Sequence, residues 1–471
     1  MSNGNPGDVG STLIGMEPID FEEPQPPEQA AERGAPPPPP PELKPVMRPR
    51  QANEPAFLPA PPRNVQATGL SHSYLEELCL KHLFQAGDLK GSEIARRTHL
   101  PSSIIEEIME RLRRQQLVDI RGSGGAGIGR SSMIFTMTED GHKVCGLSME
   151  RDRYVGPAPV PYRYYLQAVA AQTIRGSGLR KEDIEPHFGD LVVPDEVYAA
   201  IGPAMNSGKA LFFYGEPGNG KTAICQRMTD CFGGDIFIPH ALIVDDFVVK
   251  VFDETVHKRV EVESEEPLDE RWVRCRRPMI TVGGELTLED LELAYSPQVK
   301  YYEAPFQLKA NCGMLLIDDF GRQKVEPKDL LNRWIVPLES EFDFLTMHTG
   351  KKLQVPFDVF VVFSTNLDPA QLVDRAFLRR VRYKLEVTQP DRVLFGRIFE
   401  AECKKQGVPL DPAMLEYLVE KHYVAEQRPF NACEPRDLLA QVRDLCAYRG
   451  VAPVLTRELL DRVVANYFVR F

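Results

Sequence analysis

One octet of the sequence reads Gly215-Glu216-Pro217-Gly218-Asn219-Gly220-Lys221-Thr222, and it matches the phosphate-binding pattern G-x-x-x-x-G-K-[ST]. The apolar run Ala210–Tyr214 before it predicts a buried strand, and residues 223–231 after it predict a helix. This order suits phosphate binding, because glycines let backbone N–H groups surround an anion and a helix N-terminus adds partial positive charge. The octet therefore predicts a phosphate-binding loop between a strand and a helix.

Two side chains of the octet have the chemistry that a nucleotide requires. Lys221 can reach the β- and γ-phosphates, and the hydroxyl of Thr222 can bind Mg²⁺. We therefore expect ATP and Mg²⁺ as cofactors. The predicted cofactor-binding residues are Gly215, Glu216, Pro217, Gly218, Asn219, Gly220, Lys221, Thr222 and Ala223.

A second signal is an apolar run that ends in two carboxylates. The residues Gly313–Ile317 are apolar, and Asp318 and Asp319 follow them. Such a run predicts a buried parallel strand, and ligands bind at the carboxyl ends of strands in open α/β sheets. We expect Asp318 to hold Mg²⁺ through water opposite Thr222, and Asp319 to orient or activate the attacking water.

Polar and basic residues after a third apolar run complete the pattern. Residues 359–363 predict a strand, and the amide of Asn366 behind it can hold a water in line with the γ-phosphate, although a capping role is an alternative. A basic segment at 374–382 is either a solvated face or a source of arginines for a neighbouring subunit's phosphate site. Its candidates are Arg375, Arg379, Arg380 and Arg382, and Arg436 opens a later predicted helix.

The composition narrows the class of protein. A formal net charge of −12 makes the whole chain a poor general binder of nucleic acid, although one basic face remains compatible with it. No apolar run is long enough for a membrane helix, and no secretory signal opens the chain. The 9 cysteines are scattered without a C-x-x-C pair, which favours a reducing compartment. We expect a cytoplasmic protein without membrane insertion.

Two further segments precede the nucleotide-binding part. Residues 1–66 are rich in Pro and Glu and predict a disordered tail. Residues 67–150 predict three helices and two short strands around a glycine-rich tip, a pattern that resembles a winged helix-turn-helix domain. Arg111, Arg113, Arg114, Arg121 and Arg130 can contact DNA phosphates there, but the acidic residues of the same helix oppose this, so DNA binding and protein docking both stay open.

The remainder divides into three parts. Residues 151–190 predict a linker with one helix, residues 191–390 an α/β core with a parallel sheet, and residues 391–471 a helical lid. The core contains an expected insertion at about 246–306. In that insertion Tyr301 and Tyr302 either grip a substrate or pack in the interior.

The five signals in this order resemble the AAA+ ATPase superfamily over about residues 191–471. The resemblance implies a P-loop NTPase core with a helical lid, a homo-oligomeric ring with a hexamer as the expected form, and ATP hydrolysis. It assigns Walker A to 215–222, Walker B to 314–319, sensor 1 to Asn366, sensor 2 to Arg436, and a trans arginine finger to Arg379 or Arg380. One departure is Asp319, because the superfamily usually has Glu there and the shorter side chain implies slow hydrolysis.

A predicted hairpin at 344–355, centred on Gly350, resembles the pre-sensor-1 hairpin clade, which includes MoxR-like and Lon-like ATPases. Three functions follow from these resemblances. The first is an ATPase that remodels a protein partner. The alternatives are a DNA-acting ATPase, such as a loader or regulator that uses the winged helix, and a scaffold whose assembly depends on nucleotide.

Overall fold

The computed structural model describes residues 55–468, except 124–131, 190, 262–265 and 373–374. Most of the predicted tail and the glycine-rich tip with Arg130 therefore lie outside the described residues. None of the helices that the structure describes is long and apolar enough to cross a membrane.

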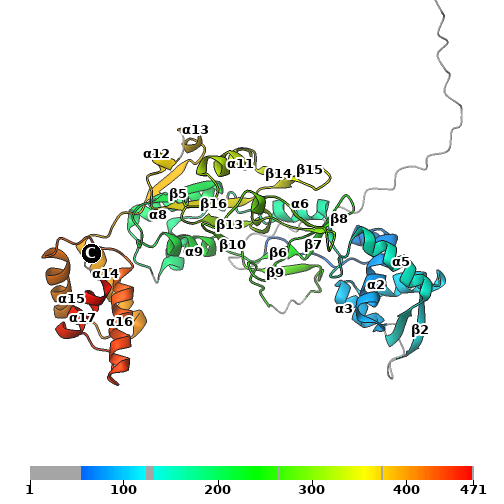
Figure 1. Cartoon of the computed structure of the whole chain (residues 1–471), viewed down its shortest axis with the longest axis horizontal. Coiled ribbons are helices and arrows are strands. Elements are labelled where there is room, and N and C mark those ends of the chain that lie inside the picture. Colours follow the sequence, from blue (N-terminus) through cyan, green and yellow to red (C-terminus); the bar gives the residue numbers. More distant parts are fainter. Residues whose placement is uncertain (1–54, 124–131, 190, 262–265, 373–374, 469–471) are drawn as a thin grey trace, which may run out of the picture. The chain divides into compact units, whose positions relative to one another are not determined.

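A five-stranded parallel sheet forms the centre of the α/β core (Figure 1). Its strand order is β10 (Met279–Val282), β13 (Gly313–Ile317), β16 (Val359–Thr365), β5 (Ala210–Tyr214) and β17 (Tyr383–Glu386). Every neighbouring pair is parallel, so all five carboxyl ends share one edge. The chain is thus an α/β protein with a P-loop NTPase core, as its sequence predicts.

Helices cover both faces of this sheet, because side chains alternate between the faces along each strand. Phe212, Leu315 and Val361 pack on one face with Trp334 of α11 (Pro327–Ser340). Side chains that follow them, such as Phe213 and Leu316, pack on the other face with α8 (Asp195–Ser207) and α9 (Lys221–Cys231). Figure 1 shows α11 and α9 on opposite sides. Two apolar layers therefore fix the strand ends that carry the polar residues.

The C-terminal unit is helical and has its own core. Its elements are α14 (Arg392–Gln406), α15 (Pro412–Val419), the short π-helix η4 (Glu420–Val424), α16 (Glu434–Tyr448) and α17 (Arg457–Tyr467). Asp391 and Thr456 cap two of these helices with side-chain oxygens, which satisfies backbone donors at the helix starts. Phe395, Phe399 and Leu438 lie in the buried interior of this unit.

The predicted insertion at 246–306 is wrong at one strand. Met279–Val282 is β10, and it pairs in parallel with β13 in the central sheet. The rest of that region joins a second five-stranded sheet that the sequence analysis did not predict. Its order is β11 (Ala294–Ser296), β12 (Tyr301–Glu303), β8 (Phe247–Lys250), β7 (Ala241–Val244) and β4 (Val160–Pro161). A separate two-stranded antiparallel ribbon, β6 (Ile236–Pro239) with β9 (Trp272–Cys275), packs into the same apolar core.

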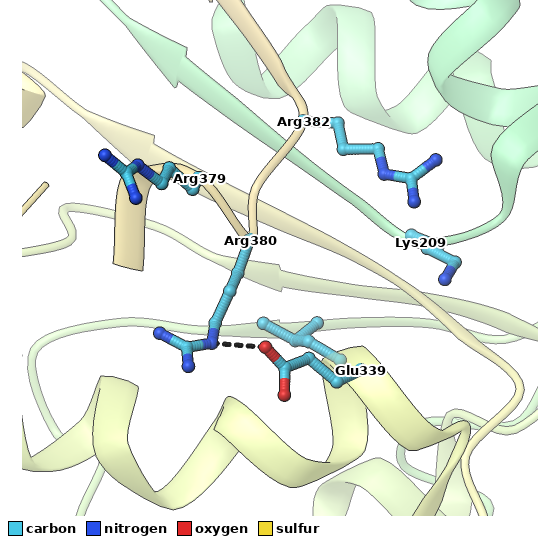
Figure 2. A pocket seen from close by; sticks show the side chains of 6 residues that line it. Lys209, Glu339, Arg379, Arg380 and Arg382 are labelled. Carbon is cyan, nitrogen blue, oxygen red and sulfur yellow. Dashed lines mark hydrogen bonds and ion pairs between the residues drawn. The ribbon is translucent and has the colours of Figure 1, made fainter. Parts of the chain in front are cut away.

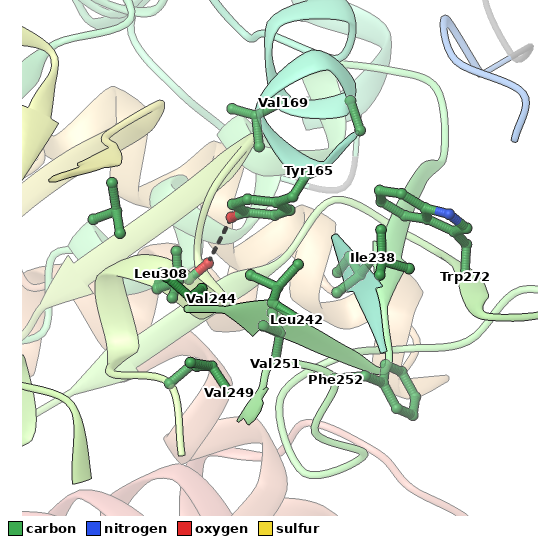
Figure 3. Close-up of a cluster of buried hydrophobic side chains, with 14 of the residues drawn as sticks. Tyr165, Val169, Ile238, Leu242, Val244, Val249, Val251, Phe252, Trp272 and Leu308 are labelled. Carbon is green, nitrogen blue, oxygen red and sulfur yellow. Dashed lines mark hydrogen bonds between the residues drawn. The ribbon is translucent and has the colours of Figure 1, made fainter. Parts of the chain in front are cut away.

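These strands form a β module with a common apolar core (Figure 3). Leu242, Val249 and Trp272 contribute to this core, and Tyr165 donates a hydrogen bond to the carbonyl of Leu308 over 3.5 Å. Tyr165 belongs to α6 (Tyr162–Ala171), and β4 also comes from the segment predicted as a linker. Further along, Ile184 of α7 (Lys181–Ile184) and Phe188 of η2 (Glu185–Phe188) pack under the central sheet. Residues 151–189 therefore contribute to two apolar cores and are more than a simple connection.

The N-terminal unit consists of helices around a small antiparallel sheet. Its elements are α2 (His72–Ala86), β1 (Leu89–Lys90), α3 (Gly91–Thr98), α4 (Ser102–Arg114), β2 (Val118–Ser123), β3 (Met133–Met137) and α5 (Glu139–Arg151), with sheet order β1-β3-β2. The predicted helices and strands are present there, and the comparison with a winged helix stays a prediction. Ala241 and Val248 of the β module lie in the same core as the helices of this unit.

The predicted boundary of the tail at residue 66 is wrong. Phe57 packs edge-on against Trp272, with ring centroids 5.3 Å apart, and also against Phe237. The carbonyl of Pro59 accepts a hydrogen bond from the backbone N–H of Asp269 over 2.9 Å. Asn64 caps α1 (Val65–Thr68). Residues 55–66 therefore belong to the folded part of the chain rather than to the tail.

The predicted hairpin is present as β14 (Phe342–Thr346) and β15 (Lys352–Pro356). Its turn is docked on the β module, because the His348 ring stacks on Tyr295 with centroids 4.1 Å apart and its backbone N–H donates to the hydroxyl of Tyr302 over 3.1 Å. Tyr302 is fully buried. Of the two roles proposed for this tyrosine, interior packing is therefore correct.

Candidate functional site

The phosphate loop connects the end of β5 to the start of α9. Two of its glycines are required by close contacts. A Cβ atom on Gly215 would lie 2.4 Å from the carbonyl oxygen of Val387, and one on Gly218 would lie 2.7 Å from the sulfur of Cys433. Both residues also have positive φ angles, which L side chains rarely adopt. The loop is thus held between the end of β17 and the helical C-terminal unit.

The ammonium group of Lys221 lies in the mouth of this loop. Its Nζ donates to the carbonyl oxygens of Gly215 over 2.7 Å and Glu216 over 2.9 Å, and to the side-chain oxygen of Asn366 over 2.8 Å. Burial lowers the pKa of Lys221, and the carboxylates of Asp318 and Asp319 oppose that shift. The positive charge is therefore held at the point where the sequence predicts phosphate oxygens.

Thr222 and Asp318 meet as predicted. The hydroxyl of Thr222, at the start of α9, donates to Oδ2 of Asp318 over 3.0 Å. Asp318 directly follows β13, so the strand order of the sheet brings its carboxylate to the phosphate loop. A hydroxyl and a carboxylate are hard oxygen ligands of the kind that Mg²⁺ prefers alongside water and phosphate. The pair thus fits a magnesium ion that is shared with a nucleotide.

No group of three or more His, Cys, Asp or Glu side chains among the described residues is arranged to hold a metal ion. A site of two protein oxygens depends on other ligands to complete an octahedron, since Mg²⁺ usually keeps waters and phosphate oxygens. The residues present therefore suit a metal that arrives with a nucleotide.

Asp319 and Asn366 face each other at the carboxyl edge of the sheet. The side-chain amide of Asn366 donates to Oδ1 of Asp319 over 3.4 Å. Asp319 has a φ of 49°, in the left-handed region, and Gln323 donates to its carbonyl oxygen over 3.1 Å. Lys221, Asp319 and Asn366 thus form a connected polar group beside the phosphate loop.

Arg436 lies in the first turn of α16, but the structure does not bring its side chain to the loop. Its Nε donates to Oδ1 of the adjacent Asp437 over 2.8 Å, and its side chain is 62% exposed. The same helix start nevertheless contacts the loop, because the backbone N–H of Cys433 donates to the carbonyl of Gly218 over 2.8 Å. Arg436 is therefore only three residues from a contact with the loop, but its guanidinium is bound to Asp437.

Arg379 and Arg380 lie at the other edge of the sheet. They line a pocket of about 440 Å³ with Lys209, which precedes β5, and Arg382, which precedes β17 (Figure 2). The five residues of β5 span about 17 Å at 3.3 Å per residue, which separates these side chains from their own phosphate loop. Arg380 donates to Glu339 over 2.5 Å, and Figure 2 shows Arg379 pointing away from that carboxylate. The side chain of Arg375 lies outside the described residues.

The turn that precedes α16 also contacts the phosphate loop and is not among the predicted site residues. Ala432 donates its backbone N–H to Oδ1 of Asn219 over 3.1 Å, next to the contact between Cys433 and Gly218. The turn is shaped by Glu434, which is buried and accepts from the backbone and side-chain nitrogens of Asn431. The spacing Asn-x-x-Glu is typical of a capping box and was the available signal for this turn.

Comparisons with known proteins give limited similarity. A family model described as "Domain of unknown function (DUF8689)" matches residues 391–466, which is the helical C-terminal unit. Among curated proteins, none matches this chain.

Two solved structures are similar to parts of this chain. The structure of NtrX from Brucella abortus is 14% identical over 63% of this chain and 58% of its own, with a TM-score of 0.36. A complex between subunits BchI and BchD of magnesium chelatase is 16% identical over 59% of this chain and 92% of its own, with a TM-score of 0.32.

Proposed function

We propose that this protein is a Mg²⁺-dependent ATPase of the AAA+ type. The observation that carries this proposal is the 3.0 Å contact between the hydroxyl of Thr222 and the carboxylate of Asp318 beside a glycine-rich loop that ends in Lys221. A P-loop requires both oxygens on one metal, and a contact between them places them on the same side of the sheet.

The remaining residues then have defined tasks in hydrolysis. Lys221 leaves its carbonyl partners and binds β- and γ-phosphate oxygens, while Asp319 accepts the proton of the attacking water and Asn366 orients that water. The oxygen of that water bonds to the γ-phosphorus as the bond from the γ-phosphorus to the β,γ-bridging oxygen breaks, which yields ADP and phosphate. Thr222 and Asp318 would hold Mg²⁺ beside the phosphates, where the ion would neutralise charge on the phosphate oxygens.

The arginine pocket supports a homo-oligomer in the proposed function. Arg379 and Arg380 lie about one strand length from their own phosphate loop, so they suit the nucleotide of a neighbouring copy. In such an arrangement the amino ends of one subunit's strands face the carboxyl ends of the next subunit's strands. A head-to-tail contact of this kind, repeated between identical subunits, closes into a ring.

A protein partner is favoured over DNA as the target. In the N-terminal unit Arg111 pairs with Glu76 over 2.7 Å, Arg113 and Arg114 both pair with Glu110, and Arg121 pairs with Asp88. Arginines that are neutralised by carboxylates of the same unit give little attraction for a phosphate backbone. We therefore propose that ATP hydrolysis remodels a protein partner, and duplex DNA binding with a steep salt dependence would contradict this choice.

Nucleotide binding provides the direct test of the proposed ATPase. The full chain should bind fluorescent ATP in the presence of Mg²⁺ and release phosphate, whereas Lys221→Ala should lose binding because no other described cation lies in the loop. Lys404→Ala is the matched control, since that lysine is exposed and pairs only with Glu400 on α14. Equal ATP binding by the parent and Lys221→Ala would reject the site. Binding without phosphate release would instead favour a nucleotide-dependent scaffold.

A further inference from the structure

Asn219 connects the phosphate loop to the helical C-terminal unit through its side chain. Its Oδ1 accepts a hydrogen bond from the backbone N–H of Ala432 over 3.1 Å, and its Nδ2 donates to the carbonyl of Glu216 over 3.4 Å. The residue is 6% exposed. One buried amide therefore binds the lid on one side and the loop on the other.

The lid presents a preformed surface to this amide. Glu434 is buried, accepts from both nitrogens of Asn431, and also accepts from the hydroxyl of Tyr423 over 2.8 Å. These bonds hold the turn before α16, so that the backbone N–H groups of Ala432 and Cys433 face Asn219 Oδ1 and the Gly218 carbonyl. Two adjacent donors thus meet two adjacent acceptors of the loop.

The contact between the two surfaces leaves no spare room. A Cβ atom on Gly218 would lie 2.7 Å from the sulfur of Cys433, so the lid rests directly on the loop backbone. Arg436 is three positions beyond Cys433 on the same helix, and the position of the helix start therefore limits where Arg436 can reach.

We propose that Asn219 is a positioning residue that holds the lid on the phosphate loop and thereby sets the rate at which ADP leaves. This inference rests on the proposed function, because it assigns a role to a residue of the same nucleotide site. A nucleotide held between loop and lid leaves when the lid lifts, and loss of the Asn219 bond makes lifting easier. Asn219 acts through Ala432 rather than on the phosphates.

Release of mant-ADP from the full chain, measured by stopped flow with Mg²⁺, tests this role. Asn219→Ala should release mant-ADP about fivefold faster than the parent, which corresponds to one lost hydrogen bond, while the association rate changes less than twofold. Tyr417→Phe is the matched control, since it removes hydrogen bonds to Asp461 that lie within the lid. A release rate equal to that of the parent in folded Asn219→Ala overturns the proposal.

A second variant tests the same contact from the lid. Asn431→Ala removes the side-chain hydrogen bond to Glu434 that helps to shape the turn, and it leaves the loop sequence intact. If both residues act through one contact, the double variant Asn219→Ala/Asn431→Ala releases mant-ADP no faster than the faster single variant. Multiplied effects would show independent causes and contradict the proposal. Failure of the parent to bind mant-ADP would instead reject the ATP site itself.

Discussion

Lys221, Asn366 and Asp319 form a chain of hydrogen bonds beside the phosphate loop. Lys221 Nζ lies 2.8 Å from the Asn366 side-chain oxygen, and the Asn366 amide lies 3.4 Å from Asp319. The carbonyls of Gly215 and Glu216 take the place that phosphate oxygens would occupy around the ammonium group. Nucleotide binding in the proposed function is therefore an exchange of oxygen partners, which preserves the charge at the loop.

Asp319 is the residue for which the proposed chemistry makes the sharpest prediction. Asp319→Asn should bind ATP within about threefold of the parent but turn it over about a hundredfold more slowly, because an amide cannot accept the proton of water. Binding is measured by fluorescence titration and turnover by phosphate release. Asp368→Asn is the control, since the Asp368 carboxylate accepts from the backbone N–H of Ala370 over 2.9 Å and the amide oxygen of Asn can accept the same bond. Unchanged turnover in Asp319→Asn would remove this residue from the mechanism.

The elements of the central sheet differ in how well the sequence predicts them. The runs that form β5, β13 and β16 are continuous and apolar, so the sequence predicts these strands directly. The polar residues that follow β5 and β13 also predict the contact between Thr222 and Asp318. The sequence does not predict β10 as a strand of the central sheet, because β10 has only four residues and one of them, Thr281, is exposed. Short strands of this kind carry little periodicity, so their sheet partner decides their place.

Long-range partners explain the other differences. Phe57 follows a Pro-rich segment, and its aromatic partners Phe237 and Trp272 lie far along the chain. Tyr302 is adjacent to Tyr301 in a polar region, and it is buried by Phe247, Tyr295 and His348, which lie far from it or on another strand. Composition describes neighbours in sequence, whereas these contacts depend on which elements meet in space.

His240, which lies between β6 and β7, should make the stability of the fold depend on pH. Burial lowers the pKa of His240 from 6.5 to about 3, and the ring packs against Phe252 and His99. The native state therefore binds this proton less readily than the unfolded state. The contribution is full above about pH 6.5 and is lost as pH falls toward 3, by at most about 1.4 kcal/mol per pH unit.

The thermal unfolding midpoint of the full chain should thus decrease as the pH is lowered from 6.5 to 5. His240→Phe keeps an aromatic ring in place without a titrating group, so its midpoint should fall less over the same interval. His82 and His257 also have pKa values lowered by burial and account for part of the remaining slope. Identical slopes in the parent and His240→Phe would contradict the assignment to His240.

The whole molecule has a phosphate loop at one edge of its sheet and an arginine pocket at the other, and this predicts complementation between subunits. Arg379→Ala/Arg380→Ala should bind ATP like the parent and hydrolyse it roughly a thousandfold more slowly. Lys221→Ala should also be inactive, but it still carries the arginines. Equal mixing of the two variants should restore up to about a quarter of the sites, where an intact loop meets an intact pocket.

Phosphate release from the mixture measures this recovery, and subunit exchange is confirmed by co-purification when one of the two variants carries an affinity tag. Each variant alone is the control for the mixture. A mixture as inactive as its two components would show that Arg379 and Arg380 do not serve a neighbouring loop.

The packing of Phe57 governs where this chain can be shortened. A fragment that starts after residue 66 loses the ring that covers Phe237 and Trp272 and the acceptor that Pro59 gives to Asp269. Exposure of these two aromatic rings creates an apolar surface patch that promotes aggregation in solution. A fragment that starts at residue 55 keeps Phe57 on these rings, so it should aggregate less and suit crystallisation or imaging better.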